Sequence, residues 1–122
     1  MRKSVSQRVR RGNMPQDRLL FVYGTLVQPA MRVRLLGRPI EAVVARLPGF
    51  ERGRRKHFFI VAKVGAMTEG MMLYGLTEAD FRILDEYEEV PRLYSRERAE
   101  VVGENGEKVR CWIYLPTSWA AH

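Results

Sequence analysis

Four carboxylates crowd the end of one predicted helix in this 122-residue chain: Asp85, Glu86, Glu88 and Glu89. Other groups able to do chemistry are scarce. The two histidines and one cysteine are too few for a plausible zinc site, and the phosphate-binding patterns GxxxxGK[ST] and GxGxxG are absent. A Ser/His/Asp or Cys/His apparatus would have to recruit His57, which begins a predicted strand beside a basic loop. We therefore expect any chemistry to rest on carboxylates, tyrosines and backbone groups.

Glu88 differs from the other three carboxylates in the face of the helix that it occupies. At 100° per residue, the apolar residues of this helix form one continuous sector: Phe81, Ile83, Leu84 and Tyr87. Glu88 projects into that sector, between Phe81 and Leu84, whereas the other carboxylates point outside it or lie at its edge. Burial would raise the pKa of Glu88, as a general base near neutral pH requires. The alternative is a helix that frays before Glu88 and leaves four solvated carboxylates.

A second candidate is the turn formed by Tyr23, Gly24, Thr25 and Leu26, which follows an apolar run and carries no charged side chain. Gly24 allows close approach of a ligand to the backbone. If the turn joins a strand to a helix beginning near Pro29, its N–H groups can converge on an anion, either a phosphate or a carboxylate. The alternative is a plain strand-to-helix turn.

The elements that would position these groups can be traced along the chain. Periodicity and turn residues predict strands at Leu19–Tyr23, Glu41–Leu47, His57–Val64 and Gly70–Leu76, and two more flanking the hairpin turn Asn105-Gly106. Two helices are predicted, Pro29–Leu36 and Thr77–Val90, the second with a capping box of Thr77 and Asp80. About six strands and two or three helices indicate a single α+β domain with a mixed, mostly antiparallel, barrel-like sheet.

The last predicted strand alternates apolar residues with more polar ones. Its apolar face holds Val109, Cys111, Ile113 and Leu115, and the opposite face holds Arg110, Trp112 and Tyr114. Cys111 is therefore expected to be an inert core thiol.

The formal net charge of +7 is concentrated at the start of the chain, where residues 1–18 hold six basic groups and one acidic group. We predict a basic, flexible leader at 1–17 and one folded domain at 18–122. Because charge in the rest of the chain is nearly balanced and stacking motifs are missing, no nucleic-acid partner is expected. The other interpretations are a nucleic-acid-binding arm assisted by Arg52–Lys56, a transit peptide, or translation starting at Met14.

Composition indicates a packed globular protein, because 46% of the residues are hydrophobic and no apolar run is long enough for a membrane span. The basic start is not followed by the apolar segment of a signal peptide. The single cysteine fits a reducing compartment. We therefore expect a cytoplasmic protein with no membrane partner.

Three segments together resemble a known family: "FVYGTL", "GMMLYGLT" and "LDEYEEVPRLYSRERAEV". From about Leu19 to Leu115 the chain is similar to the gamma-glutamylcyclotransferase-like superfamily, in particular its AIG2-like and gamma-glutamylamine cyclotransferase branch. The resemblance implies that the Tyr23–Leu26 turn binds substrate through its backbone and that Asp85-x-x-Glu88 supplies Glu88 as the catalytic residue. Tyr94-x-Arg96 matches the next element of the family, and Tyr94 joins the expected substrate-binding residues. Glu89 stands where the family usually has Gly.

The activity implied by the resemblance is the release of an amine or amino acid from a gamma-glutamyl compound with formation of 5-oxoproline. This reaction needs neither a cofactor nor a metal, so none is expected, and the expected partner is a small gamma-glutamyl substrate. The alternative is a non-catalytic module of the same fold that binds a small ligand or a partner. The sequence leaves the leaving group and the oligomeric state open.

Overall fold

The computed structural model describes residues 18–54 and 58–118. Its sheet is a closed barrel with the strand order β1-β3-β2-β4-β5. The strands are β1 (Leu20–Val22), β2 (Ala42–Arg54), β3 (Phe58–Leu73), β4 (Tyr94–Gly103) and β5 (Lys108–Pro116). All pairings are antiparallel except that of β1 with β5, which closes the barrel in parallel. The α+β class and the mostly antiparallel barrel predicted from the sequence are confirmed.

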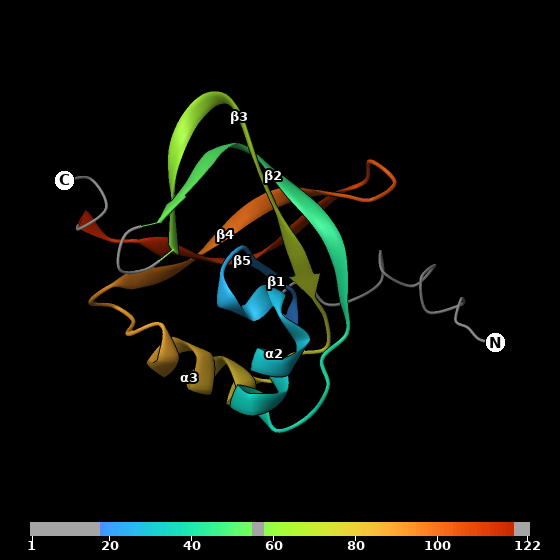
Figure 1. Cartoon of the computed structure of the whole chain (residues 1–122), viewed down its shortest axis with the longest axis vertical. Coiled ribbons are helices and arrows are strands. Elements are labelled where there is room, and N and C mark those ends of the chain that lie inside the picture. The colour runs from blue at the N-terminus through green and yellow to red at the C-terminus, as the bar shows by residue number, and fades with distance from the viewer. Residues whose placement is uncertain (1–17, 55–57, 119–122) are drawn as a thin grey trace.

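The helices gather on one side of the barrel, below the strands in Figure 1. They are the short 3-10 helix η3 (Thr25–Val27) and the helices α2 (Pro29–Leu36) and α3 (Glu78–Tyr87). A second core therefore forms between barrel and helices, separate from the core inside the barrel.

Strand β1 is apolar throughout because it serves both cores. Phe21 points into the barrel core together with its neighbours Leu19 and Tyr23, whereas Leu20 and Val22 point into the core beneath the helices. Alternate side chains of a strand face opposite sides of a sheet, so burial on both sides removes the usual polar alternation. The turn Tyr23–Leu26 follows directly and is thereby placed at the junction of the two cores.

The prediction of two separate strands at His57–Val64 and Gly70–Leu76 was wrong, because β3 runs without a break from Phe58 to Leu73. The register of β2 with β3 shifts between Pro48 and Phe50, and residues 63–66 of β3 bulge out at this point. Gly65, which lies in the bulge, has a positive φ of 83°. The polar residues that suggested a loop are absorbed by the sheet. Thr68 is buried, and its hydroxyl donates to the Phe50 carbonyl oxygen at 2.9 Å. Five strands thus replace the expected six.

Strand β2 is also longer than predicted, since it continues beyond Leu47 to Arg54 through the segment expected to be a loop. Strand β3 continues alongside it, so the backbone N–H and C=O groups of this basic segment find hydrogen-bond partners within the sheet. Residues 55–57 of that segment, the leader at 1–17 and the two histidines lie outside the described residues. The domain boundary at 17/18 stays a prediction.

The two predicted helices are confirmed, with one correction at the second. Helix α2 has its predicted bounds and ends at Gly37, whose φ of 79° suits glycine. Helix α3 begins with the predicted capping box of Thr77 and Asp80 but ends at Tyr87 instead of Val90.

The apolar sector predicted for α3 is too wide. Phe81 and Leu84 are buried, whereas Ile83 is 40% exposed and Tyr87 39% exposed. The helix therefore packs on the barrel through a narrow stripe that includes Phe81 and Leu84.

An ion pair ties the loop after α2 to the start of α3. The Arg38 guanidinium donates to both carboxylate oxygens of Asp80, at 2.8 and 2.6 Å, and the Thr77 N–H donates to the same carboxylate at 2.8 Å. These hydrogen bonds, the one from Arg38 above all, lower the pKa of the buried Asp80 from 3.8 to about 2 against the opposite effect of burial.

This ion pair makes folding stability depend on acid pH. A carboxyl whose pKa is lower in the folded state than in the unfolded state stabilises the fold when the pH is above the unfolded-state pKa. This contribution is lost as the pH falls from the unfolded-state pKa to the folded-state pKa. We expect the free energy of unfolding to fall by about 2 kcal/mol between pH 4 and pH 2 through this group. Asp80→Asn should lose that amount already at pH 7, whereas Glu78→Gln, in the same helical turn, should not. Urea unfolding across pH checks this, and equal effects of both substitutions would contradict it.

Candidate active site

The Tyr23–Leu26 turn and the end of α3 meet in the structure. The Thr25 hydroxyl and the Tyr87 hydroxyl lie 2.9 Å apart, joined by a hydrogen bond between residues 62 positions apart in the sequence. Tyr87 is the last residue of α3 and directly precedes Glu88. The two regions selected from the sequence therefore lie side by side.

Glu88 is the residue at which α3 ends, and its N–H donates to the Leu84 carbonyl oxygen at 2.8 Å. The helix thus stops before Glu88, as the alternative interpretation held, yet Glu88 does not become a solvated residue. Burial raises the pKa of its carboxyl from 4.5 to about 7. The other two glutamates of the cluster, Glu86 and Glu89, are exposed.

The charge of the Glu88 carboxyl acts on three tyrosines: Tyr23 directly after β1, Tyr94 at the start of β4 and Tyr114 on β5. Burial is the main cause that raises the pKa of each phenol, and the negative charge of Glu88 adds to it in all three. At neutral pH their hydroxyls therefore stay protonated and can donate hydrogen bonds but cannot act as bases. Glu88 is the group in this cluster with a pKa suited to proton transfer near neutrality.

Hydrogen bonds on both sides hold the turn in place. The Tyr23 hydroxyl donates to the Tyr114 carbonyl oxygen at 2.5 Å, and the Arg52 guanidinium of β2 donates to the Tyr23 carbonyl oxygen at 2.9 Å. Buried Arg32 of α2 donates to the carbonyl oxygens of Leu26 and Val27, at 3.0 and 2.9 Å. Strand, sheet and helix thus fix the backbone of the turn.

The first backbone N–H groups of the turn are not used by the hydrogen bonds of η3. The hydrogen-bond ladder of η3 begins with the N–H groups of Val27 and Gln28, which donate to the carbonyl oxygens of Gly24 and Thr25, both at 3.1 Å. The N–H groups of Gly24, Thr25 and Leu26 precede this ladder, as the first donors of any helix do. Three consecutive donors of this kind suit a ligand oxygen with negative charge.

Asp85, the first acid of the Asp-x-x-Glu pattern, has a positioning role. Its carboxylate accepts hydrogen bonds from Arg96 at 2.9 and 3.2 Å and from the Tyr114 hydroxyl at 2.6 Å. The Arg96 guanidinium in turn lies over the rings of Phe81 and Trp112, 4.6 and 4.4 Å from their centroids. The end of α3, and with it Glu88, is thereby clamped onto β4 and β5.

Sequence analysis missed three residues of this site. Tyr114 was placed on the more polar face of its strand, yet it is buried beneath the helices. Arg52 was assigned to a solvated loop, and Tyr87 to the buried sector. Only for Tyr114 was there a signal in the sequence, because a tyrosine and a tryptophan on one face of a strand indicate that this face is covered.

The residue after Glu88 is strained. Helix α3 ends in a Schellman motif, in which Val90 N–H donates to the Asp85 carbonyl oxygen and Glu89 N–H to that of Glu86, at 2.9 and 3.0 Å. The motif requires a left-handed residue, and Glu89 adopts φ 57° there. Glycine is the usual residue at this place because a side chain opposes that conformation. The turn forms with glutamate all the same, and the exposed Glu89 pairs with Arg92.

The described parts of the chain contain no group of three or more His, Cys, Asp or Glu side chains that could hold a metal ion. The expectation that no cofactor is needed stays a prediction. None of the helices in these parts is long and apolar enough to cross a membrane. The buried Cys111 has a pKa raised to about 12, mainly by burial, in agreement with an unreactive thiol.

Fold and site together define a small barrel domain in which a half-buried carboxyl with a raised pKa lies beside a turn with backbone donors, and comparison with known proteins identifies its family. Residues 20–121 match the family described as gamma-glutamyl cyclotransferase, AIG2-like. The chain therefore belongs to this family. The resemblance drawn from the three sequence segments is confirmed.

Curated relatives agree with this assignment. The chain is 30% identical over 105 residues to a Methanocaldococcus jannaschii protein named as a gamma-glutamylcyclotransferase, with a provisional ribonuclease assignment in the same name. It is 35% identical over 100 residues to the AIG2-like protein C of Arabidopsis thaliana. The alignments cover 79% of this chain but 45% and 57% of those proteins, so the chain spans about half the length of the curated relatives it matches.

Solved structures share the fold. The solution structure of an Arabidopsis thaliana protein superposes with a TM-score of 0.75 at 32% identity, covering 84% of this chain and 70% of the other. A gamma-glutamyl cyclotransferase superposes with a TM-score of 0.71 at 22% identity, covering 82% of this chain and 66% of the other, which shows a common fold.

The strain at Glu89 yields a stability prediction. Glu89→Gly should raise the free energy of unfolding by about 0.5–1 kcal/mol, because the left-handed penalty is removed but the unfolded chain gains freedom. Glu89→Ala is the control, since it removes the same carboxylate while keeping a Cβ at positive φ, and it should not stabilise. Urea denaturation measures both variants. A gain with alanine equal to that with glycine would mean that the carboxylate, and not the backbone, is the cause.

Proposed function

We propose that this chain is a cyclotransferase that converts a gamma-glutamyl compound into 5-oxoproline and releases the amine or amino acid. The observation that carries the proposal is the position of Glu88, which is half-buried at the end of α3 beside the Tyr23–Leu26 turn and whose pKa burial raises to about 7. Membership of the family supports the reaction type. The identity of the leaving group is treated separately below.

The Tyr23–Leu26 turn would orient the substrate. The α-carboxylate of the gamma-glutamyl group would accept hydrogen bonds from the N–H groups of Gly24, Thr25 and Leu26. Pinning this end brings the flexible glutamyl chain into the bent conformation in which its amine approaches its own side-chain amide. Orientation of this kind can supply a large share of the rate in an intramolecular reaction.

Glu88 would transfer the protons. Its carboxylate takes a proton from the substrate α-ammonium, and the neutral amine nitrogen then attacks the γ-amide carbon to close a five-membered ring. The bond from that carbon to the leaving nitrogen breaks, and Glu88 returns its proton to this nitrogen. The ring nitrogen still carries two hydrogens at this point. Glu88, ionised again, takes the second proton and passes it to the released amine, which leaves as its ammonium form. No enzyme nucleophile is required, and atoms and charge then balance over the cycle.

The tyrosines complete the site electrostatically. Negative charge develops on the γ-carbonyl oxygen during attack, and hydroxyl donors that stay protonated can stabilise it. Tyr94, whose phenol has a pKa raised by burial and by the charge of Glu88, is the residue that we assign to this contact or to binding of the ground state. Asp85 and Arg96 act at a distance, by holding the end of α3 in place.

A non-catalytic binding module remains the second candidate, because Glu89 takes the place of the glycine that is usual at the helix end. Both candidates use the same turn and the same end of α3. Release of 5-oxoproline from any gamma-glutamyl compound separates them.

Substitution of Glu88 tests its catalytic role. Glu88→Gln keeps size and hydrogen-bonding reach but cannot accept a proton, so turnover should fall by roughly 10²–10⁴-fold. Stability should not fall with it, because ionisation of a carboxyl with a raised pKa opposes folding, by up to about 3 kcal/mol at pH 8. Glu86→Gln and Glu89→Gln, which change exposed glutamates of the same cluster, are the controls and should keep near-normal activity. If all three variants behave alike, Glu88 is not the catalytic residue.

The pH dependence of activity provides a separate prediction. A general base works in its ionised form, so kcat/KM should fall as pH drops through the pKa of Glu88, about 7. An exposed glutamate would place the same decline more than two pH units lower. Measuring kcat/KM from pH 5 to pH 9 locates the midpoint, and a midpoint near 4.5 would show that the working carboxyl is not buried.

A further inference from the structure

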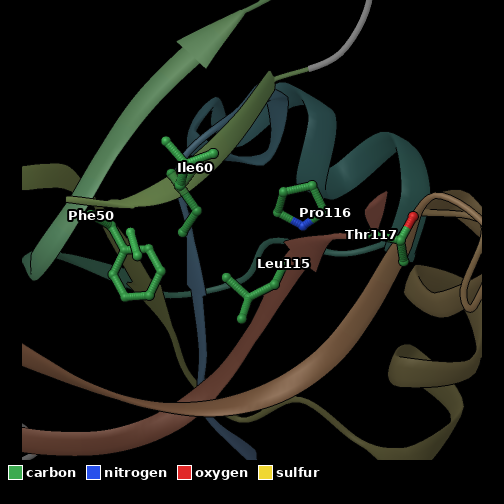
Figure 2. Close-up of a pocket in the computed structure, with 7 residues that line it drawn as sticks. Phe50, Ile60, Leu115, Pro116 and Thr117 are labelled. Atoms are coloured by element: carbon green, nitrogen blue, oxygen red, sulfur yellow. The ribbon is translucent and has the colours of Figure 1, made fainter. Parts of the chain in front are cut away.

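A cavity of about 240 Å³ opens at the end of the barrel where β2, β3 and β5 come together. Figure 2 shows its apolar walls, with Phe50 and Ile60 on one side and Leu115 and Pro116 on the other. Ala62 lies opposite Phe50 in the sheet register and contributes to the lining. Thr117 supplies a hydroxyl at one edge. The cavity is thus nearly free of polar groups.

The cavity adjoins the proposed active site through its own walls. Leu115 follows Tyr114, whose carbonyl oxygen accepts the hydrogen bond from Tyr23, and Ile60 packs in the same core as the Tyr23 ring. Pro116 pairs with Tyr94 in the sheet. The Tyr114 side chain lies on the opposite face of β5 from Leu115, so it is the backbone of Tyr114 and the strand pairing of Tyr94 with Pro116 that connect the cavity to the tyrosines on which the charge of Glu88 acts.

The other edge of the cavity reaches the chain that follows Glu88. The Thr117 hydroxyl donates to the carbonyl oxygens of Arg92 and Leu93, at 2.7 and 3.1 Å, and the Thr117 N–H donates to Leu93 at 2.9 Å. This hydroxyl proton is thus already engaged with the protein. The walls of the cavity therefore offer mainly hydrocarbon to a bound group.

Charge near the cavity opposes a cationic occupant. Arg52 lies opposite Ile60 in the sheet register, and its guanidinium bonds to the Tyr23 carbonyl oxygen between cavity and turn. None of the described residues that line the cavity is acidic, so an ammonium group there would lose hydration without a carboxylate in its wall, and the positive charge of Arg52 would add to this cost. An uncharged apolar chain would instead gain from leaving water, by about 0.8 kcal/mol for each buried CH₂.

We propose that this cavity receives the leaving group and that the preferred substrates are gamma-glutamyl amides of uncharged, apolar amines. The inference rests on the proposed function. Because a water molecule occupies about 30 Å³ in the liquid, the volume suits a leaving group of roughly five to eight non-hydrogen atoms. The reacting amide then lies between the turn, which holds the glutamyl end, and the cavity, which holds the amine end.

A matched pair of substrates tests the charge preference. Gamma-glutamyl-pentylamide and gamma-glutamyl-5-aminopentylamide have the same chain and differ by a terminal ammonium group. The wild-type protein should show kcat/KM for the pentylamide at least tenfold above that for the aminopentylamide, measured by mass detection of 5-oxoproline. Equal values, or preference for the cation, would overturn the cavity assignment while leaving the cyclotransferase in place. Release of 5-oxoproline from no gamma-glutamyl compound would overturn both.

Filling the cavity tests its location. Ala62→Phe places a ring in the cavity from an exposed strand position, so kcat/KM for the pentylamide should fall at least tenfold while that for gamma-glutamyl-ethylamide changes less than threefold. Val64→Phe is the control, because Val64 is fully exposed on the same strand and does not line the cavity. An equal loss for both substrates in Ala62→Phe, or the same loss in the control, would overturn the assignment. The wild-type substrate pair decides the question independently if Ala62→Phe does not fold.

Discussion

The three-residue strand β1 is the constraint on which the rest of the structure depends. Its side chains fill the barrel core on one side and the helix-side core on the other, and it closes the barrel by pairing with β3 and, in parallel, with β5. Gly70 of β3 shows how closely the chains pack here, since a Cβ at this position would lie 2.2 Å from the Val22 carbonyl oxygen. A strand buried on every side holds its final residues rigidly. The turn that follows β1 therefore begins from a fixed point.

The second half of the site depends on electrostatics at the end of α3. Asp85 accepts hydrogen bonds from Arg96 and Tyr114, and this network brings a short helix down onto the sheet. Glu88 is then carried into an environment that disfavours its charge, which is the physical origin of its raised pKa. Two acids three residues apart thus have different surroundings. Asp85 is held by hydrogen bonds from Arg96 and Tyr114 and positions the helix, whereas Glu88 is half-buried and has a raised pKa, which is the basis for the proposed proton transfer.

Local signals in the sequence were reliable where a few neighbouring residues decide the outcome. The bounds of α2, the capping box of Thr77 and Asp80 and the Asn105-Gly106 hairpin turn depend on local backbone preferences, and all three are present. Prediction failed where long-range pairing decides. Strand β3 continues beyond the predicted break because β2 pairs with it, and Tyr87 is 39% exposed although the apolar sector predicted burial. For the site, the structure brings the turn and the end of α3 together, the roles of their residues stay predictions, and the network around Asp85 was not foreseen.

The sequence by itself determined the family, through three short segments in order, and with it the class of fold and the candidate catalytic carboxylate. The sequence also showed that Glu89 stands where the family usually has glycine. Only the structure showed why this matters, since Glu89 is the left-handed residue of the motif that ends α3. Only the tertiary structure decided which groups face Glu88, because Tyr23, Tyr94 and Tyr114 come from three strands brought together by barrel closure. The apolar cavity beside them is likewise a product of packing, since its walls come from segments more than 50 residues apart in the chain. Sequence patterns record local preference and burial, whereas the juxtaposition of distant side chains is set by strand register and closure, which no local pattern encodes.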